Sequence, residues 1–234
     1  MPPQEKHKST PPVSGVDRIG ALPDHMIQHV ISFLPAQAAV RTCVLARQWR
    51  HLWRSTTGLR IVGLDDKQEC IVHDLRKFVD HLLILRGHAD LNTVEIKFDK
   101  FLEDDVPYVN LWTRFALMHR VQALTLYINA PVDLCLDNLP LVSPHLRTLD
   151  LYGVALQERF LDFASCPALE DLKMDLCDIN AGRISSSSLK HLSISISSSD
   201  WNCRVHVSTP GLISLKLVDF IVRFHKRFET LPYI

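Results

Sequence analysis

Two histidines stand four residues apart in the segment HMIQH, where His25 and His29 would lie on one side of a helix. Histidine pairs at this spacing bind zinc in metalloproteases, but that motif also carries a glutamate directly after the first histidine. Here Met26 holds that position, and no third ligand is suggested nearby. The sequence therefore predicts surface histidines and no metal site.

The cysteines are the other residues with intrinsic reactivity, and six are scattered along the chain: Cys43, Cys70, Cys135, Cys166, Cys177 and Cys203. No two form a C-x-x-C pair, and a thiol-ligase mechanism would need an activated cysteine. Cys43, Cys166 and Cys177 fall within segments that we predict to be regular structure, so we expect structural thiols. We expect them to be reduced, since the first residues lack the apolar stretch of a secretory signal.

Motifs for nucleotide and hydrolase chemistry are absent from the sequence. There is no G-x-G-x-x-G, no G-x-x-x-x-G-K and no G-x-S-x-G, and the chain has only eight glycines. We therefore predict a non-catalytic protein without a cofactor.

Positive charge is concentrated near the N-terminus. Residues 1–60 hold eight Lys/Arg and three Asp/Glu, so the remaining eighteen Lys/Arg and twenty-three Asp/Glu give the rest a net charge of −5. Basic clusters can bind nucleic acid, and four arginines lie close together: Arg41, Arg47, Arg50 and Arg54. On helices these arginines fit better as the solvated edge of a protein-docking surface, so we predict no nucleic-acid partner.

The overall composition is that of a folded soluble protein, with 47% hydrophobic and 22% charged residues among 234. That length allows one or two domains. No run of about 18 apolar residues exists, so we predict no membrane span. These features lead us to expect a cytoplasmic or nuclear protein.

A helical block follows a flexible lead predicted for residues 1–16. Pro23 suits the first turn of a helix, the apolar residues from Met26 to Leu34 recur with helical spacing, and Pro35 ends that helix. Residues 36–45 and 47–53 are predicted to form a second and a third helix. The block spans residues 17–57.

This block holds more large apolar side chains than a unit of about 40 residues can bury, and a unit so small rarely folds stably alone. The side chains are Leu22, Met26, Ile27, Val30, Ile31, Phe33, Leu34, Val40, Val44, Leu45, Trp49, Leu52 and Trp53. The surplus predicts a surface that another polypeptide covers.

A different pattern, L-x-x-L-x-L, recurs through the second part of the chain. Its six copies are Leu91/Val94/Ile96, Val121/Leu124/Leu126, Leu146/Leu149/Leu151, Leu169/Leu172/Met174, Leu189/Leu192/Ile194 and Leu212/Leu215/Leu217. Their first positions are 30, 25, 23, 20 and 23 residues apart, close to the period of leucine-rich repeats. Pro144, Pro167 and Pro210 each stand two residues before a leading leucine. The pattern predicts a solenoid with one short parallel strand per repeat.

The residues between the inward leucines should form rows across the outer face of the sheet. One predicted row is Glu95, Thr125, Asp150, Lys173, Ser193 and Lys216, and the next is Lys97, Tyr127, Tyr152, Asp175, Ser195 and Val218. Solenoids use this face for binding, although a merely solvated face is the alternative for any single residue. The candidate binding residues are Glu95, Lys97, Tyr127, Asp150, Tyr152, Lys173 and Asp175.

The other segments connect these strands. Residues 58–90 are predicted to be a helical connector with an amphipathic helix at 71–85, and residues 91–234 the repeats. Further helices are predicted at 105–119 and 158–164, and the serine clusters at 185–188 and 197–199 as turns. Two interpretations remain for the residues after the last repeat: a capping element that covers the end of the solenoid, or a truncated form of a longer protein. The capping residues would be Phe220, Ile221, Phe224 and Phe228.

Residues 17–57 resemble an F-box, in the form typical of plant F-box proteins with leucine-rich repeats. The motifs that carry the resemblance are DRIGALPDHMI, VISFLP and AVRTCVLARQWRHLW, followed by Leu59. FVDHLLILRG, VNLWTRFALMHRVQALTLYI, SCPALEDLKMDLCDI and STPGLISLKLVDF resemble repeat segments of the same family. The resulting fold class is α+β to α/β: a three-helix F-box followed by an irregular leucine-rich-repeat solenoid with a short-stranded parallel sheet.

The resemblance implies the substrate-recognition subunit of a Skp-cullin-F-box ubiquitin ligase. The F-box would bind a Skp-family adaptor, which bridges to a cullin with its RING subunit, and the repeats would bind a target protein. The alternative is a truncated or non-ligase scaffold. The predicted core or contact residues of the F-box are Leu22, Pro23, Ile27, Ile31, Leu34, Pro35, Val44, Leu45 and Trp49, and the sequence does not separate core from contact.

Overall fold

The computed structural model describes residues 19, 22–63, 72–99, 102–129, 134–136, 140–195 and 205–218. The predicted lead (1–16), the serine cluster at 197–199 and the predicted capping residues lie outside these ranges.

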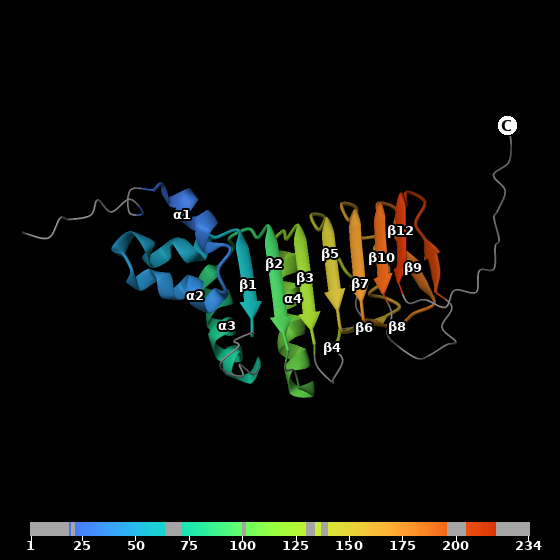
Figure 1. The fold of residues 1–234 in the computed structure, drawn as a ribbon, viewed down its shortest axis with the longest axis horizontal. Coiled ribbons are helices and arrows are strands. Elements are labelled where there is room, and N and C mark those ends of the chain that lie inside the picture. Colours follow the sequence, from blue (N-terminus) through green and yellow to red (C-terminus); the bar gives the residue numbers. More distant parts are fainter. Residues whose placement is uncertain are drawn as a thin grey trace, which may run out of the picture.

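Short helices form the N-terminal block at one end of the molecule (Figure 1). The proline before each α-helix has extended backbone, so α1 (Asp24–Ile31) starts after Pro23 and α2 (Ala36–Arg41) after Pro35. The chain then tightens into the 3₁₀ helices η1 (Thr42–Val44) and η2 (Arg47–Ser55). The segment predicted as a third helix is therefore 3₁₀ rather than α-helical.

A parallel sheet of seven strands follows, in the order β1-β2-β3-β5-β7-β10-β12 (Figure 1). The strands are β1 (Gly58–Val62), β2 (Thr93–Phe98), β3 (Ala123–Ile128), β5 (Thr148–Tyr152), β7 (Asp171–Asp175), β10 (His191–Ser195) and β12 (Ser214–Val218). Strand order follows chain order throughout, as in a solenoid whose repeats each contact only their neighbours. The predicted repeat architecture with a parallel sheet is confirmed.

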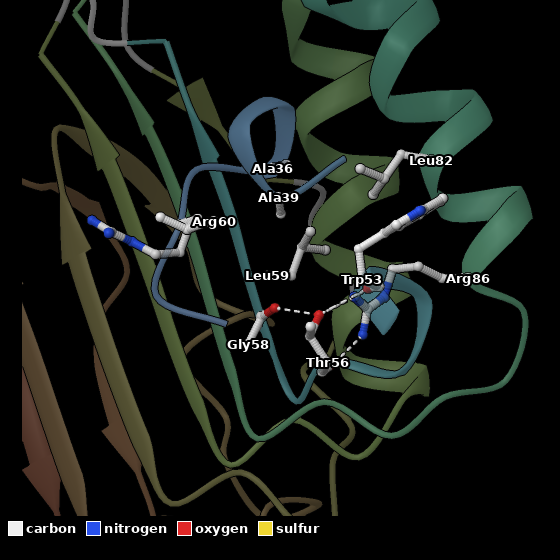
Figure 2. A pocket seen from close by; sticks show the side chains of 10 residues that line it. Ala36, Ala39, Trp53, Thr56, Gly58, Leu59, Arg60, Leu82 and Arg86 are labelled. Atoms are coloured by element: carbon white, nitrogen blue, oxygen red, sulfur yellow. Dashed lines mark hydrogen bonds between the residues drawn. The ribbon is translucent and has the colours of Figure 1, made fainter. Parts of the chain in front are cut away.

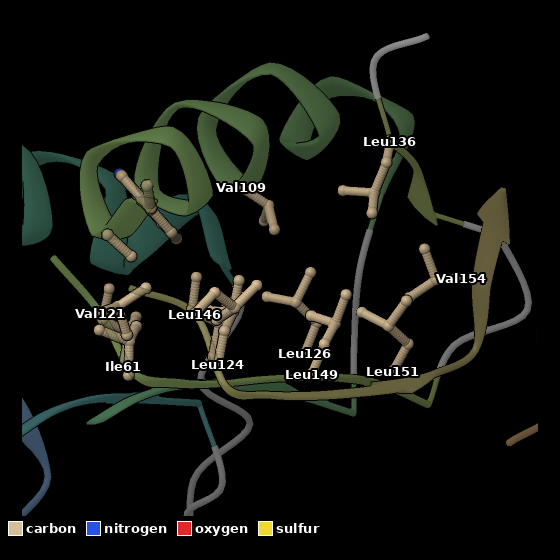
Figure 3. Packing of buried hydrophobic residues seen from close by; sticks show 14 of the residues in the cluster. Ile61, Val109, Val121, Leu124, Leu126, Leu136, Leu146, Leu149, Leu151 and Val154 are labelled. Atoms are coloured by element: carbon tan, nitrogen blue, oxygen red, sulfur yellow. The ribbon is translucent and has the colours of Figure 1, made fainter. Parts of the chain in front are cut away.

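Alternation of burial along each strand explains why the leucine pattern produces this sheet. In β3, Leu124, Leu126 and Ile128 are buried while the residues between them are half-buried. Leu124 pairs with Leu149 of β5, and Leu126 with Leu151, so equal positions of successive repeats stack in one core (Figure 3). Val109 points into this core from the helix that covers it.

Two helices cover the inner face beside the first strands. α3 (Val72–Arg86) lies where residues 71–85 were predicted to be helical. α4 (Val106–Met118), preceded by the 3₁₀ turn η3 (Glu103–Asp105), lies within the predicted 105–119 helix. Trp112 of α4 is buried on the inner face of the sheet, and its Nε1 donates a hydrogen bond to Asp80 of α3 at 3.2 Å.

Later repeats return by short strands instead of helices. β4 (Leu134–Cys135), β6 (Val154–Gln157) and β8 (Asp178–Asn180) form a second parallel sheet, and β9 (Arg183–Ser185) pairs with β11 (His206–Ser208). The helix predicted at 158–164 is wrong, because this segment forms turns and an isolated bridge. α4 occupies the 30-residue repeat, whereas the repeats of 20 to 25 residues leave no room for a helix of that length.

The sheet begins earlier than the first predicted repeat. The segment 58–90, predicted as a helical connector, contains strand β1 as well as α3, and β1 pairs with β2 over five residues from Gly58↔Thr93 to Val62↔Lys97. Leu59 and Ile61 of β1 are buried in the common core. The N-terminal block is therefore joined directly to the first strand of the sheet.

A tight turn after β5 depends on glycine. Gly153 has φ +65°, and a Cβ at this position would lie 1.9 Å from the carbonyl oxygen of Ile128. Leu176 occupies the equivalent position after β7, also with positive φ (50°), and its side chain is exposed. The next repeat thus adopts positive φ at the equivalent position with a side chain present, at a cost of roughly 1 kcal/mol for leucine, whereas the turn at Gly153 has no room for a Cβ.

Candidate functional site

Exposed apolar side chains gather on the N-terminal block. Val44 is 81% exposed, Leu45 68% and Phe33 61%, although each is a side chain that globular proteins usually bury. Met26 and Val30 of α1 are exposed as well. We call these five residues the apolar docking residues. Their exposure shows that the block leaves part of its apolar side chains uncovered.

Other apolar residues of the block are buried in its own packing. Ile27 and Ile31 are each 2% exposed, and Leu52 and Trp53 of η2 are also buried. Because Ile27 and Ile31 lie four positions apart, they share one face of α1, and Met26 and Val30, also four apart, lie on an adjoining face. Phe33 lies in the turn that follows α1. The helical spacing of these apolar residues was predicted, but their division between two faces was not.

The nine residues predicted from the resemblance therefore have different environments. The buried ones are Ile27 and Ile31. Those half-buried against the core are Leu22, Leu34 and Trp49. The exposed ones are Pro23, Pro35, Val44 and Leu45. The prediction did not include Met26, Val30 or Phe33.

Side chains of β1 and α3 hold the block against the solenoid. Arg60 of β1 donates one hydrogen bond to the carbonyl oxygen of Phe33 at 2.6 Å and one to Glu95 of β2 at 2.6 Å. Pro35 also forms an isolated parallel bridge with Arg60. The strand edge of β1 is thus covered by the segment between α1 and α2.

Arg86 is the second link, and it is a buried cation (Figure 2). Its guanidinium donates to the Trp53 carbonyl oxygen at 3.2 Å, to Thr56 Oγ1 at 2.9 Å and to the Thr56 carbonyl oxygen. Among the described residues no carboxylate pairs with it, and its Nε has no partner. Burial lowers the pKa of Arg86 to about 10, so it remains charged at neutral pH.

The residues that line this junction leave almost no free space. Trp53, Leu59 and Leu82 line the gap beside the Arg86 and Thr56 contact, as do Ala36 and Ala39 of α2 (Figure 2). The gap admits about one water-sized sphere, roughly 10 Å³. It is a packing feature rather than a ligand cavity.

The outer face of the sheet is the second candidate surface. The register aligns the predicted rows as expected, with Glu95↔Thr125, Thr125↔Asp150 and Asp150↔Lys173 in one and the tyrosine row beside it. Two further residues of β1, Arg60 and Val62, extend these rows. The seven candidate binding residues thus lie together on one face: Glu95, Lys97, Tyr127, Asp150, Tyr152, Lys173 and Asp175.

Two tyrosines form the centre of this face. The rings of Tyr127 and Tyr152 are stacked, with centroids 4.2 Å apart and an interplanar angle of 15°. Lys97 Nζ lies 4.6 Å from the centroid of the Tyr127 ring, a cation–π contact. The Tyr127–Tyr152 pair, two of the seven candidate binding residues, is a preformed aromatic platform.

Charged groups border the platform. Lys173 Nζ lies 2.5 Å from Asp175 Oδ2 and 3.8 Å from Asp150 Oδ1, so one ammonium serves two carboxylates. The hydrogen bond to Asp175 raises the pKa of Lys173, while burial raises the pKa of Asp150. The three side chains together carry a net charge of −1.

The described cysteines differ sharply in accessibility. Cys166 and Cys177 are buried, and their thiols donate to the carbonyl oxygens of Leu141 at 3.2 Å and Leu151 at 3.5 Å. Burial raises the pKa of both thiols, that of Cys177 to about 12. Cys135 is exposed and Cys43 half-buried.

We expect the four described cysteines to react with a thiol reagent at different rates. Iodoacetamide at pH 8 should alkylate Cys135 first, because only the thiolate reacts and only this thiol is exposed among the four. Cys166 and Cys177 should react only as fast as the protein opens, which site-resolved mass spectrometry over a time course measures. Early alkylation of Cys177 would contradict the packing described here.

Neither a metal-binding cluster nor a membrane-spanning helix occurs in the described residues. No group of three His, Cys, Asp or Glu side chains there could hold a metal ion. None of the helices in those residues is long and apolar enough to cross a membrane.

Comparison with known proteins assigns both halves. Residues 19–59 match the F-box domain, and residues 81–230 match the family described as FBD-associated F-box protein At5g56370, LRR repeats. Neither match is to a catalytic family. No solved structure gives a significant match.

Curated plant proteins resemble the chain along most of its length. The F-box/FBD/LRR-repeat protein At5g22660 of Arabidopsis thaliana is 30% identical over 88% of this chain and 53% of its own length. The MEIOTIC F-BOX protein MOF of Oryza sativa subsp. japonica is 30% identical over 86% of this chain and 46% of its own. The chain spans about half the length of these relatives. With the repeats matched over more than half of it, the chain belongs to the family of F-box proteins with FBD-associated leucine-rich repeats.

Proposed function

We propose that the protein is a substrate-recognition subunit of a Skp-cullin-F-box ubiquitin ligase. The observation that carries the proposal is the exposure of the apolar docking residues on a block that matches the F-box domain. Large apolar side chains of this kind anchor protein interfaces when a partner covers them. The F-box would bind a Skp-family adaptor, and the adaptor would connect the chain to a cullin and its RING subunit.

The contacts of Arg60 and Arg86 support separate roles for the two halves, with the F-box binding the adaptor and the repeats binding the target. They tie the F-box to β1 and α3 through hydrogen bonds to the carbonyl oxygens of Phe33, Trp53 and Thr56. A target on the outer face of the sheet would then be held at a fixed orientation to the adaptor. Such positioning is what transfer of ubiquitin to a bound target requires, and the chain itself would supply no catalytic group.

Reconstitution from purified proteins tests the proposal. The full chain, expressed alone, is mixed with a plant Skp-family adaptor, and the complex is measured by size-exclusion chromatography and calorimetry. We expect a one-to-one complex with a dissociation constant of about 1 µM or lower. Addition of cullin and RING subunits should produce a four-protein assembly.

Each result bears on a different part of the proposal. Absence of any complex with the adaptor would reject the docking role. Binding of the adaptor without recruitment of the cullin would indicate a non-ligase scaffold instead. A fluorescent fusion in plant cells would test the proposed cytoplasmic or nuclear location.

A further inference from the structure

Among the described residues, Tyr152 has a ring or cation contact on one face only, the stacking with Tyr127, and we call its other side the open face. Lys97, on β2, lies over one face of Tyr127, and Tyr152 stacks on the other. Because β5 lies between β3 and β7, the second face of Tyr152 looks toward β7. The residue paired with Tyr152 in the register on that side is Asp175. The open face of Tyr152 and the carboxylate of Asp175 therefore border the same position on the outer face of the sheet.

The charge at this position is incompletely balanced. Asp150 and Asp175 share the single ammonium of Lys173, and all three side chains are partly exposed to solvent. A tyrosine face attracts a cation through its quadrupole, as the contact of Lys97 with Tyr127 already demonstrates within this row. A second cation, supplied by a partner, would meet both an attractive ring and a net negative charge.

From this juxtaposition we infer that the open face of Tyr152, with Asp175, binds an arginine side chain of the target protein. Arginine fits better than lysine because its planar guanidinium stacks on a ring while its N–H groups donate to a carboxylate in the same plane. The inference rests on the proposed function, since it identifies the kind of target segment that the repeats recognise. The target is thus a protein that presents an exposed arginine to this sheet.

A pair of small probes tests the inference on the full chain. N-acetyl-arginine N-methylamide carries the guanidinium, and the citrulline analogue has nearly the same shape without the charge. The chain has four tyrosines, so selective ¹³C labelling of tyrosine rings yields few NMR signals, and Tyr152→Phe assigns the relevant one. We expect the arginine probe to shift the Tyr152 signal with millimolar affinity, at least about fivefold tighter than the citrulline probe.

Variants with opposite expected effects keep the test independent of folding. Tyr152→Leu, followed on the Tyr127 signal, and Asp175→Asn, followed on the Tyr152 signal, should each weaken binding of the arginine probe about fivefold to tenfold. Lys173→Met should strengthen it several-fold, because both carboxylates are then released from their internal partner. A gain of affinity cannot arise from damage to the fold.

Matched controls lie on the same face. Asp171→Asn removes a carboxylate from β7 four residues away, about 13 Å along the strand, and Lys216→Met removes an exposed ammonium from the row of Lys173. Neither should change the affinity. The inference is overturned if citrulline binds as tightly as arginine, or if Asp171→Asn matches the effect of Asp175→Asn. Adaptor binding, measured on the same samples, separates this failure from failure of the proposed ligase role.

Discussion

A chain carrying both Val44→Ser and Leu45→Ser is expected to bind the Skp-family adaptor about 10³-fold more weakly than the unmodified chain. Each side chain is largely exposed in the free protein and would be buried in the complex. Truncating such an anchor costs about 2 kcal/mol, and the two together therefore correspond to about three powers of ten in the dissociation constant. Isothermal titration calorimetry with the purified adaptor measures the loss.

Substitutions at Val44 and Leu45 test adaptor binding without also destabilising the fold. Leu34 and Trp49 are attractive from sequence, but both are packed against the core, so their replacement would also loosen the block. Val44→Ser with Leu45→Ser should leave the unfolding midpoint in urea within a few tenths of a molar. Ile213→Ser, at an exposed aliphatic residue near the opposite end of the sheet, is the matched control. Unchanged adaptor affinity in the double variant would remove the main support for the docking surface.

Arg86→Ala is expected to destabilise the folded protein by about 3–5 kcal/mol. The substitution leaves the carbonyl oxygens of Trp53 and Thr56 without their buried donor and opens a gap beside Leu82. The cost of burying the guanidinium opposes this loss, and the pKa shift to about 10 corresponds to roughly 3 kcal/mol. We expect the lost hydrogen bonds and packing to outweigh that relief.

The same pKa shift predicts how stability depends on pH. Since burial lowers the pKa of Arg86, the unfolded chain binds more protons than the folded one above about pH 10. The penalty is therefore present in full below about pH 10 and is relieved as pH rises further, so Arg86 contributes no pH dependence near neutrality. Titration of the unfolding free energy between pH 6 and 9 should show the same slope for Arg86→Ala and the unmodified chain.

Equilibrium urea denaturation and hydrogen exchange measure the effect of Arg86→Ala. Exchange should accelerate most in residues 22–63, because the lost contacts join that segment to α3. Arg120→Ala is the control, since Arg120 forms an exposed ion pair with Asp90 at 3.4 Å and should contribute below about 1 kcal/mol. A loss of less than about 1 kcal/mol in Arg86→Ala would mean that the junction depends on other contacts.

Sequence periodicity predicted the large sheet well because each strand contributes alternate residues to a single core. Leu124 and Leu149 are as buried as their pattern requires, and the outward rows align as expected. The final repeat follows the pattern in register, yet Leu215 is about half exposed. Periodicity therefore located the strands more reliably than it predicted their burial.

Other features depend on contacts that no local pattern encodes. Strand β1 was missed because GLRIV is short and its pairing partner, Thr93–Phe98, lies 35 residues away. The segment 158–164 has helix-forming residues, but the length of its repeat selects turns. Buried and exposed residues of the F-box are equally apolar, so only packing into the common core separates Ile27 from Val44.

The position of the F-box against β1 has a practical consequence for dissecting the protein. The segment from Ser32 to Ala36 shields the first strand, and a Cβ on Gly58 would already approach the Ser32 carbonyl oxygen to 2.6 Å. Removing the F-box would leave β1 with open backbone donors and acceptors, the geometry that invites strands of other molecules to add. A repeat region expressed by itself should self-associate, so the two proposed binding roles are better separated by point substitutions than by deletion.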